Sequence, residues 1–287
     1  MDYKLMFLFL RKLNGVGVVK QNKTYVPFMN ENKDEKDLFE FILSKEKKLT
    51  QADLDVAYEQ AKKEYDVFIT DSSVQVLSVF DVNYPQKLND LGDKRPVLLF
   101  VKGDLNALSR ESLGVIGTRE PSDRSVAAES KMVEQAVKWT GRAIVSGMAL
   151  GCDFVAHRTA LDNDGCTIAV LPSGFNHIYP MLHIDLAKEI AESSGCLLSE
   201  YTPEEMADKY TFVRRDTLVA ALSDKLFIVE CGLNSGTMYA VKDAVKMERP
   251  IGCFHPNDIT FEGNGLIIKQ HHAIPITVYS DWDKFLG

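Results

Sequence analysis

The sequence predicts an α/β protein with a doubly wound, mostly parallel sheet, preceded by a small helical domain. From Leu113 onward, short apolar runs alternate regularly with amphipathic segments of helical length. The runs are continuous over four or five residues, which is typical of parallel strands covered by helices on both faces. Most runs end in glycine or in small polar residues. These features predict strands that are joined by crossover helices.

The individual strands and helices follow from this alternation. Apolar runs predict strands at 113–116, 143–145, 167–171, 196–199, 226–229 and 251–254, with a last short strand at 274–278. The intervening segments show the spacing of amphipathic helices. Those helices are expected at 122–139, 153–163, 181–193, 213–222 and 235–247, and a final helix follows the last strand.

The first part of the chain has a different character. Residues 1–73 are predicted to form a separate helical domain, and residues 74–287 the α/β domain. Two further strands, at 74–79 and 97–101, introduce the second domain. The Gly15-Val16-Gly17 turn resembles the turn of a helix-hairpin-helix, whose amides can hold a phosphate, and it can equally be a plain helix–helix connection.

Composition and charge exclude several classes of protein. The net charge of −8 argues against a surface that coats duplex DNA non-specifically, although a local basic groove remains compatible with it. No apolar run approaches the roughly 20 residues that cross a bilayer. The five cysteines are scattered without a C-x-x-C pair, so we expect reduced thiols and no metal site. A cytoplasmic protein without a membrane association is therefore expected.

The carboxyl ends of five successive strands carry glycine or polar signatures. Parallel strands present these ends at one edge of the sheet, where open α/β sheets bind ligands. Helix amino termini at that edge offer free N–H groups and a partial positive charge, which suit phosphate. A phosphate-bearing ligand is therefore predicted there. The signatures are G-T-R at 117–119, S-G-M-A-L-G-C-D at 146–153, P-S-G at 172–174, S-E at 199–200 and E-C-G-L-N-S-G-T at 230–237.

Several charged residues at this edge admit two interpretations. Arg119 is expected to contact phosphate, and the alternative is an ion pair with Glu200 or Glu230. The two glutamates are expected to hold arginines in place, and the alternative is general acid–base work. Asp153 and His157, four residues apart, are interpreted as a helix cap and a buried hydrogen-bonded residue, and the alternative is an acid–base pair.

The motif series resembles the DNA-processing protein A family, also called DprA or Smf, from about residue 75 to the end. The most specific motif is S-G-x-A-x-G-x-D-x-x-A-H at 146–157. Others that match in order are D-x-x-Y-P at 81–85, G-x-R at 117–119, Y-P at 179–180, L-x-S-E at 197–200 and S-G-T at 235–237. The resemblance implies a Rossmann-like domain that binds single-stranded DNA, self-associates as a homodimer and helps to load a RecA-type recombinase. It implies no catalytic residues, no metal and no cofactor.

The resemblance and the strand ends together predict a set of site residues. We expect Asp153, His157, Glu200 and Glu230 to order the loops. Base stacking is expected from rim aromatics such as Phe175, Tyr179 and Phe212. The predicted DNA- or phosphate-binding residues are Gly117, Thr118, Arg119, Ser146, Gly147, Met148, Gly151, Gly174, Phe175, Tyr179, Phe212, Arg214, Arg215, Ser235, Gly236 and Thr237.

The chain departs from the family pattern at one motif. Where the family usually has F-P-x-R-N-R, this sequence keeps the first arginine as Arg215 and has Asp216 and Thr217 in place of the asparagine and the second arginine. The lost guanidinium and the added carboxylate are expected to weaken phosphate binding unless Arg214 compensates. Many members also have a carboxy-terminal winged helix, which we do not expect here. A divergent member is therefore predicted.

Two other functions are compatible with such a sheet. The related lonely-guy-type phosphoribohydrolases carry P-G-G-x-G-T-x-x-E, and the corresponding stretch here lacks two glycines and has Ala240 in place of the catalytic glutamate. These departures argue against the hydrolase, whereas a nucleotide-binding sensor remains compatible with the sequence. A dinucleotide-dependent dehydrogenase is disfavoured because Arg119 stands where G-x-G-x-x-G requires its second glycine.

Overall fold

The computed structural model describes residues 1–31, 33–258 and 261–287, and the chain forms two compact units, Met1–Val101 and Lys102–Gly287. Each unit is described by itself. The predicted domain boundary near residue 73 marks the change from a helical pattern to alternating strands and helices, and it stays a prediction. Within the described residues, no helix is both long and apolar enough to cross a membrane.

The first unit is mainly helical, as the sequence predicts. The apolar side chains of α1, from Leu5 to Leu10, are all buried. The long helix α5 packs against α1 and begins at a capping box, in which Thr50 and Asp53 satisfy each other's backbone N–H groups. Strands β1 and β2 form an antiparallel pair. The elements are α1 (Tyr3–Lys12), α2 (Val18–Lys20), η1 (Gln21–Tyr25), α3 (Val26–Met29), α4 (Glu35–Lys45), α5 (Gln51–Thr70), β1 (Gln75–Ser78), η2 (Gln86–Lys94) and β2 (Leu98–Gly103).

The second unit is an α/β domain built on a parallel sheet, which confirms the predicted fold class. Its strands lie in the order β6-β5-β4-β3-β7-β8-β9, and each neighbouring pair is parallel. From β3 the chain first adds strands toward one edge and then returns to β7 and continues toward the other. The strands are β3 (Ser112–Ile116), β4 (Ala143–Ser146), β5 (Thr167–Leu171), β6 (Cys196–Ser199), β7 (Lys225–Ile228), β8 (Ile251–Phe254) and β9 (Ile274–Ile276).

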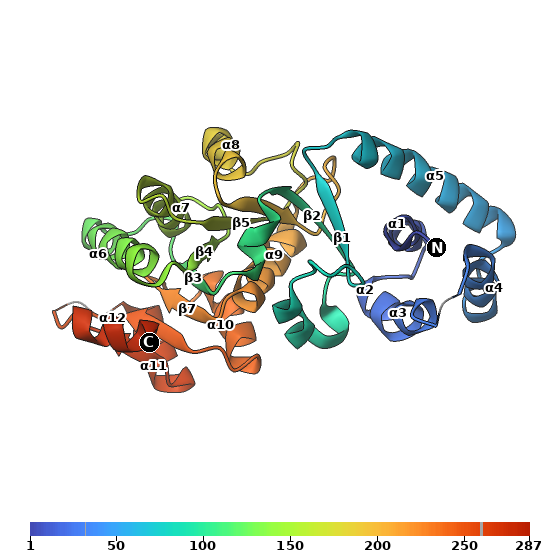
Figure 1. Ribbon diagram of the computed structural model, residues 1–287. Helices are drawn as coiled ribbons and strands as arrows, with labels where there is room; N and C mark the ends of the chain where they lie inside the picture. The colour runs from blue at the N-terminus through green and yellow to red at the C-terminus, as the bar shows by residue number, and fades with distance from the viewer. Residues whose placement is uncertain (32, 259–260) are drawn as a thin grey trace. The chain divides into compact units, whose positions relative to one another are not determined.

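Helices cover both faces of this sheet. Figure 1 shows α6 and α7 together on one side of the strands and α9 with α10 on the other. The core on the α6 side combines Leu113 and Val115 of β3 with apolar side chains of α6, α7 and α12. The helices are η3 (Leu105–Ser109), α6 (Asp123–Gln135), η4 (Ala136–Thr140), α7 (Cys152–Asp162), η5 (Met181–His183), α8 (Ile184–Glu192), α9 (Lys209–Leu222), α10 (Thr237–Lys246), α11 (Glu262–His271) and α12 (Tyr279–Leu286).

The structure differs from the predicted elements in several places, and the predicted helix 122–139, for example, divides into α6 and η4. Helix α9 begins at Lys209 rather than 213, because Asp208 caps it by accepting from the N–H groups of Tyr210 and Thr211. The predicted helix 181–193 divides into η5 and α8. Helix α11 was not predicted, because its sequence EGNGLIIKQH contains two glycines and only a short apolar stripe.

The reversal of strand order between β3 and β7 decides where a ligand can bind. The connection from β3 goes to α6, and the connection from β7 goes to α10 on the opposite face. Loops that leave neighbouring strands toward opposite faces leave a crevice between them at the carboxyl edge. The G-T-R signature follows β3 and the S-G-T signature follows β7, so the topology brings the two signatures to one crevice.

Candidate functional site

A cavity of about 500 Å³ opens in this crevice, and we refer to it as the β3–β7 cavity. It is formed by the loop after β3, by the loop before α10, and by side chains from α7 and α9. It is lined by Ile116, Gly117, Thr118, Arg119, Ala149, Asp153, Arg215, Asp216, Gly232, Asn234, Ser235, Gly236 and Thr237. The structure therefore brings together the two predicted signatures that are most distant in the sequence.

The loop 117–119 is held in place by its backbone. The Thr118 N–H donates to the Glu230 carbonyl over 2.7 Å, and the Thr118 carbonyl accepts from the Cys152 N–H over 3.1 Å. Gly151 has a φ of +75°, and a Cβ there would lie 2.4 Å from the Thr118 oxygen. Glycine is required at that position because the two loops are in backbone contact. The loop is consequently preorganised without help from its own side chains.

Arg119 is the cation that this loop presents. Its side chain is exposed, and among the described residues it makes no hydrogen bond or ion pair. The predicted alternative, a pair with Glu200 or Glu230, is not formed. Glu200 instead binds Arg214, and Glu230 accepts from the N–H and hydroxyl of Ser122 at the start of α6. The guanidinium of Arg119 is thus available to an anion.

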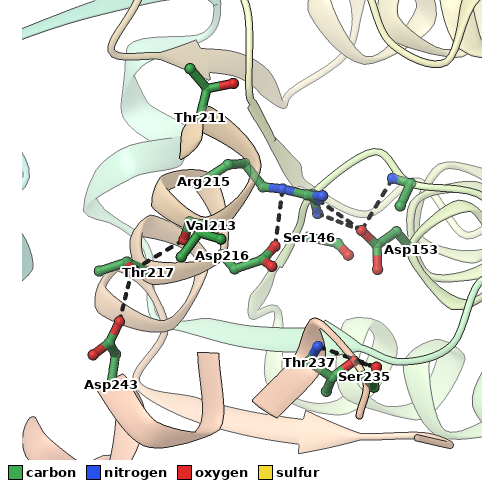
Figure 2. A network of polar contacts seen from close by, with 12 residues as sticks. Ser146, Asp153, Thr211, Val213, Arg215, Asp216, Thr217, Ser235, Thr237 and Asp243 are labelled. Carbon is green, nitrogen blue, oxygen red and sulfur yellow. Dashed lines mark hydrogen bonds and ion pairs between the residues drawn. The ribbon is translucent and has the colours of Figure 1, made fainter. Parts of the chain in front are cut away.

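The opposite wall of the β3–β7 cavity is the amino terminus of α10. Gly236 occupies the N-cap position without a side-chain cap. The Ser235 and Thr237 hydroxyls lie 3.0 Å apart, and the Thr237 hydroxyl donates to the Gly117 carbonyl over 3.3 Å. Figure 2 shows Ser235 and Thr237 close together at this terminus. Hydroxyls and the positive end of a helix dipole favour a negatively charged group.

The floor of the cavity is a buried ion cluster. Arg215 donates through Nη1 to Asp153 Oδ2 over 3.0 Å, and its Nε lies 3.1 Å from Asp216 Oδ1 (Figure 2). The Asp153 Oδ2 atom also accepts from the N–H groups of Gly147 and Ala149. Asp153 therefore orders the loop after β4. We predicted that Asp153 caps α7, but this was wrong, because the N-cap residue of α7 is Gly151.

His157 orders the same region from the core. It is fully buried, and its Nδ1 lies 2.7 Å from the Thr167 hydroxyl. Burial lowers the pKa of His157 to about 3, and the nearby His183 and Arg215 act in the same direction. The ring is therefore neutral near pH 7. A neutral imidazole that contacts a buried hydroxyl agrees with the structural interpretation rather than with an acid–base pair.

The two arginines of the altered motif do not face the cavity as free cations. The Arg214 guanidinium pairs with both oxygens of Glu200. Arg215 is buried against the Gly147 backbone, where a Cβ on Gly147 would lie 1.3 Å from Nη1. Both arginines are thus already paired with carboxylates, and their role as phosphate-binding cations stays a prediction. Glu200 does hold an arginine, as predicted, whereas Glu230 holds Ser122.

A small hollow adjoins the β3–β7 cavity beyond Arg119. Arg119, Ala149 and Arg215 line both spaces, and Leu150, Tyr179 and Phe212 line the hollow alone. The Tyr179 and Phe212 rings meet edge to face with centroids 5.1 Å apart, and Tyr179 is about half exposed. An exposed aromatic ring thus lies beside the exposed guanidinium.

Four predicted binding residues are buried away from solvent, which corrects their assignment. Ser146 is fully buried, and its hydroxyl donates to the Val115 carbonyl between neighbouring strands. Met148 is fully buried, and its carbonyl lies 2.8 Å from His183 Nδ1. Gly174 packs against the backbone of Thr202, and Phe175 is buried beside it. These residues shape loops and do not present side chains to a ligand.

Sequence reasoning missed several residues that line the cavity. Asp216 is the most consequential, and its only signal was its departure from the family motif. Gly232 and Asn234 lie within the 230–237 signature but are not among the predicted site residues. Among the described residues, no group of three or more His, Cys, Asp or Glu side chains is placed to hold a metal ion.

The chain is similar to known proteins over most of this unit. A model of the family described as DNA recombination-mediator protein A matches residues 75–286. Protein Smf of Escherichia coli (strain K12) is 35% identical over 194 residues, which are 65% of this chain and 50% of that protein. DNA processing protein DprA of Streptococcus pneumoniae (strain ATCC BAA-255 / R6) is 33% identical over 197 residues, which are 69% of this chain and 67% of that protein. The chain thus spans about half to two thirds of the length of these curated relatives.

Solved structures agree with this similarity. The X-ray structure of DNA processing protein A from Streptococcus pneumoniae matches with a TM-score of 0.81 at 26% identity, covering 97% of this chain and 96% of that one. DNA processing protein A from Helicobacter pylori, which binds single-stranded DNA, matches with a TM-score of 0.66 at 29% identity, covering 74% and 94%. Since the family model covers well over half of the chain, this protein belongs to the DNA recombination-mediator protein A family, as its resemblance to DprA and Smf predicts.

Proposed function

We propose that this protein binds single-stranded DNA without cleaving it and acts in DNA uptake, processing and recombination. The observation that carries the proposal is the β3–β7 cavity, which is lined both by the exposed Arg119 and by the amino terminus of α10. The single-stranded DNA bound by the Helicobacter pylori relative supports the same ligand class. Protection of single strands during recombination is the role that we assign to this binding.

The contacts that we propose follow from the chemistry of the lining groups. A backbone phosphate is bound by Arg119, by the Thr118 loop and by the hydroxyls of Ser235 and Thr237. Tyr179, beside Arg119, stacks on a base, because aromatic faces accept every base and so bind single strands without sequence preference. Gly117 and Gly236 line the cavity and allow the backbone to approach the ligand closely, whereas Gly151 holds the loop 117–119 in place.

The acidic balance of the protein limits the size of this interface. With a net charge of −8, long-range attraction to a polyanion is weak, and binding depends on a few local phosphate contacts. Each neutralised phosphate of a single strand contributes about 0.7 to the slope of log affinity against log salt. We therefore expect a salt dependence that corresponds to few contacts rather than to a long basic groove.

Three further elements of the proposal come from the family resemblance. We propose a homodimer, assistance in loading a RecA-type recombinase, and a cytoplasmic location. The five cysteines are free and buried, which is compatible with a reducing compartment. Light scattering measures the oligomeric state, and co-purification with a purified recombinase on single-stranded DNA tests the partner.

The decisive experiment compares two arginines at opposite ends of β3. Fluorescence anisotropy of labelled oligo-dT is measured at low and moderate salt for the parent, Arg119→Ala and Arg110→Ala. Arg110 precedes the strand and is exposed, so it is a matched control. We expect Arg119→Ala to weaken binding by about 1–3 kcal/mol and Arg110→Ala to bind like the parent. Equal affinities of all three proteins would place the DNA elsewhere.

Recognition of a free nucleotide is the second candidate function. A cavity of about 500 Å³ is within the range of small-ligand sites and is large enough for one nucleotide. Adenosine monophosphate that displaces oligo-dT at equimolar concentration, or that binds when oligo-dT does not, would favour this alternative. Release of free base from adenosine monophosphate would favour a phosphoribohydrolase. Ala240 argues against that activity, because it provides no carboxylate at the position of the catalytic glutamate.

A further inference from the structure

The ion cluster on the cavity floor contains one guanidinium and two carboxylates. Arg215 contacts Asp153 through Nη1 and Asp216 through Nε, and both Arg215 and Asp153 are buried. Asp153 Oδ2 accepts two backbone N–H groups as well. Among the described residues, Asp216 forms an ion pair with Arg215 alone, and its Oδ2 accepts no hydrogen bond. The negative charge of Asp216 is therefore less well compensated than that of Asp153.

Asp216 faces the same space in which a phosphate would bind. It lines the β3–β7 cavity, and its Oδ2 is 3.7 Å from the position of a Cβ on Gly236, at the start of α10. Figure 2 shows Asp216 between Arg215 and the Ser235–Thr237 terminus. An ionised carboxylate here repels the anion that the helix terminus, the hydroxyls and Arg119 attract.

The charged groups around Asp216 come from three elements. Arg215 lies on its own helix, Asp153 on α7, and Arg119 on the loop after β3. The segment 232–237 contributes hydroxyls and amides but no titratable side chain. Two guanidinium groups thus face two carboxylates, and an incoming phosphate places a third negative charge among them. Protonation of one carboxyl restores the balance and provides an O–H donor.

We propose, as a consequence of the proposed single-stranded DNA binding, that phosphate binding in the β3–β7 cavity is coupled to uptake of a proton by Asp216. The protonated carboxyl donates to the phosphate that the ionised form repels. Because such coupling is reciprocal, the bound phosphate in turn favours the protonated form. Affinity for single-stranded DNA therefore increases as the pH falls toward mildly acidic values.

The titration range of Asp216 fits this coupling. Burial raises the pKa of Asp216 to about 6, although Arg215 and Arg119 act in the opposite direction. A nearby bound phosphate adds a like charge and raises the pKa further. Proton uptake then accompanies binding between pH 6 and neutrality. An asparagine at this position would have a neutral side chain at every pH and would still donate a hydrogen bond.

The test measures oligo-dT affinity by anisotropy between about pH 5.5 and pH 8.5 at constant ionic strength. The parent is compared with Asp216→Asn and with Asp283→Asn, which removes the same charge from an exposed position on α12. We expect the parent to bind roughly tenfold more tightly at the acidic end, which is about 1.4 kcal/mol. Asp216→Asn should bind at neutral pH as tightly as the parent at acidic pH, with little pH dependence. Asp283→Asn should follow the parent.

The outcomes separate this inference from the proposed function. Parent binding that does not change with pH, or an Asp216→Asn variant that keeps the parent's pH dependence, overturns the proton coupling and leaves DNA binding intact. The variant retains every histidine, so histidine titration would appear in both proteins. An equal gain in Asp283→Asn would attribute the effect to net charge and also overturn the inference. Absence of binding by all three proteins at low salt would instead overturn the proposed function.

Discussion

Arg215 Nη1 lies 3.0 Å from Asp153 Oδ2, and this buried ion pair joins α9 to the start of α7 across the carboxyl edge of the sheet. The two side chains are only 6% and 7% exposed. Since Asp153 also accepts the N–H groups of the loop after β4, the pair fixes the wall of the cavity. An arginine that the family motif suggests as a DNA contact therefore has a structural role in this protein.

Truncation of the buried Arg215 should destabilise the fold more than truncation of an exposed arginine does. Arg215→Ala leaves the Asp153 carboxylate buried without its cation, and removal of one partner of a buried pair costs about 3–5 kcal/mol. Urea unfolding near pH 7 measures the loss. Arg119→Ala, at an exposed position, should change the unfolding free energy by less than about 0.5 kcal/mol. Similar stabilities of the two variants would contradict the role given to Arg215.

Gly147→Ala should disrupt the same pair from the other side. The new Cβ would lie 1.3 Å from Arg215 Nη1 and 2.3 Å from its Cζ, so the guanidinium must leave Asp153. We expect a loss of roughly 3 kcal/mol or more in thermal or urea unfolding. Gly232→Ala is the matched control, because a Cβ there meets no atom within 4 Å. A parent-like Gly147→Ala protein would show that the guanidinium has another low-energy position.

Asp216→Asn should stabilise the folded protein at neutral pH. The pKa of Asp216 is about 6 in the folded state and is ordinarily 3.8, so the folded state holds this proton more tightly than the unfolded state. The stability that the proton provides is complete below pH 3.8 and is lost as the pH rises to about 6. The variant should therefore exceed the parent by up to about 3 kcal/mol at pH 7.5 and by little near pH 4. A constant difference in unfolding free energy at both pH values would contradict this interpretation.

Glu129 should make the protein sensitive to alkaline pH. Its side chain is fully buried on α6, where its hydrogen-bonding neighbour is the weakly polar Cys152 thiol and, among the described residues, no cation pairs with it. Burial raises the pKa of Glu129 well above 4.5, and the charge of Asp153 acts in the same direction. The stability of the protonated carboxyl is thus lost as the pH rises through this raised value.

The neutral isostere Glu129→Gln isolates that effect. Its advantage in unfolding free energy over the parent should be small near pH 4.5 and should widen toward pH 9. Glu134→Gln, at a partly exposed position on the same helix, should follow the parent closely at each pH, because surface ion pairs contribute little to stability. A parent and Glu129→Gln variant with parallel pH profiles would mean that Glu129 is hydrated or paired.

The sheet and its binding edge were predictable because they depend on local patterns. Continuous apolar runs such as Leu113–Ile116 indicate buried strands because they are too short for helices and end in turn residues, and the glycine signatures after them indicate close loop contacts. The predicted loop 117–119 and the predicted terminus 235–237 do meet in one cavity. Helix α11 escaped prediction because its two glycines weaken the helical pattern, and packing of Ile267 and Asn264 compensates for them.

The roles of individual polar residues were less predictable, because a sequence shows charge but not partners. Arg119, Arg214 and Arg215 are equivalent cations in the sequence. In the structure one is exposed, one is paired with Glu200 and one is shared between two aspartates. Ser146 and Ser235 likewise both follow a predicted strand, yet in the structure Ser146 is the last residue of β4 and is bonded inside the sheet, whereas Ser235 lines the cavity.

The sequence by itself determined the fold class, the family and the edge of the sheet that carries the site, since each depends on the order of residue types along the chain. Only the tertiary structure decided which charges are available at that edge. Burial and the pairing of side chains such as Arg215 and Asp153, 62 positions apart, depend on how α7 and α9 pack on the sheet. The same packing leaves Arg119 exposed and Asp216 partly buried near it. Their electrostatic interactions then depend on distances in space and on access to water, which the sequence does not show.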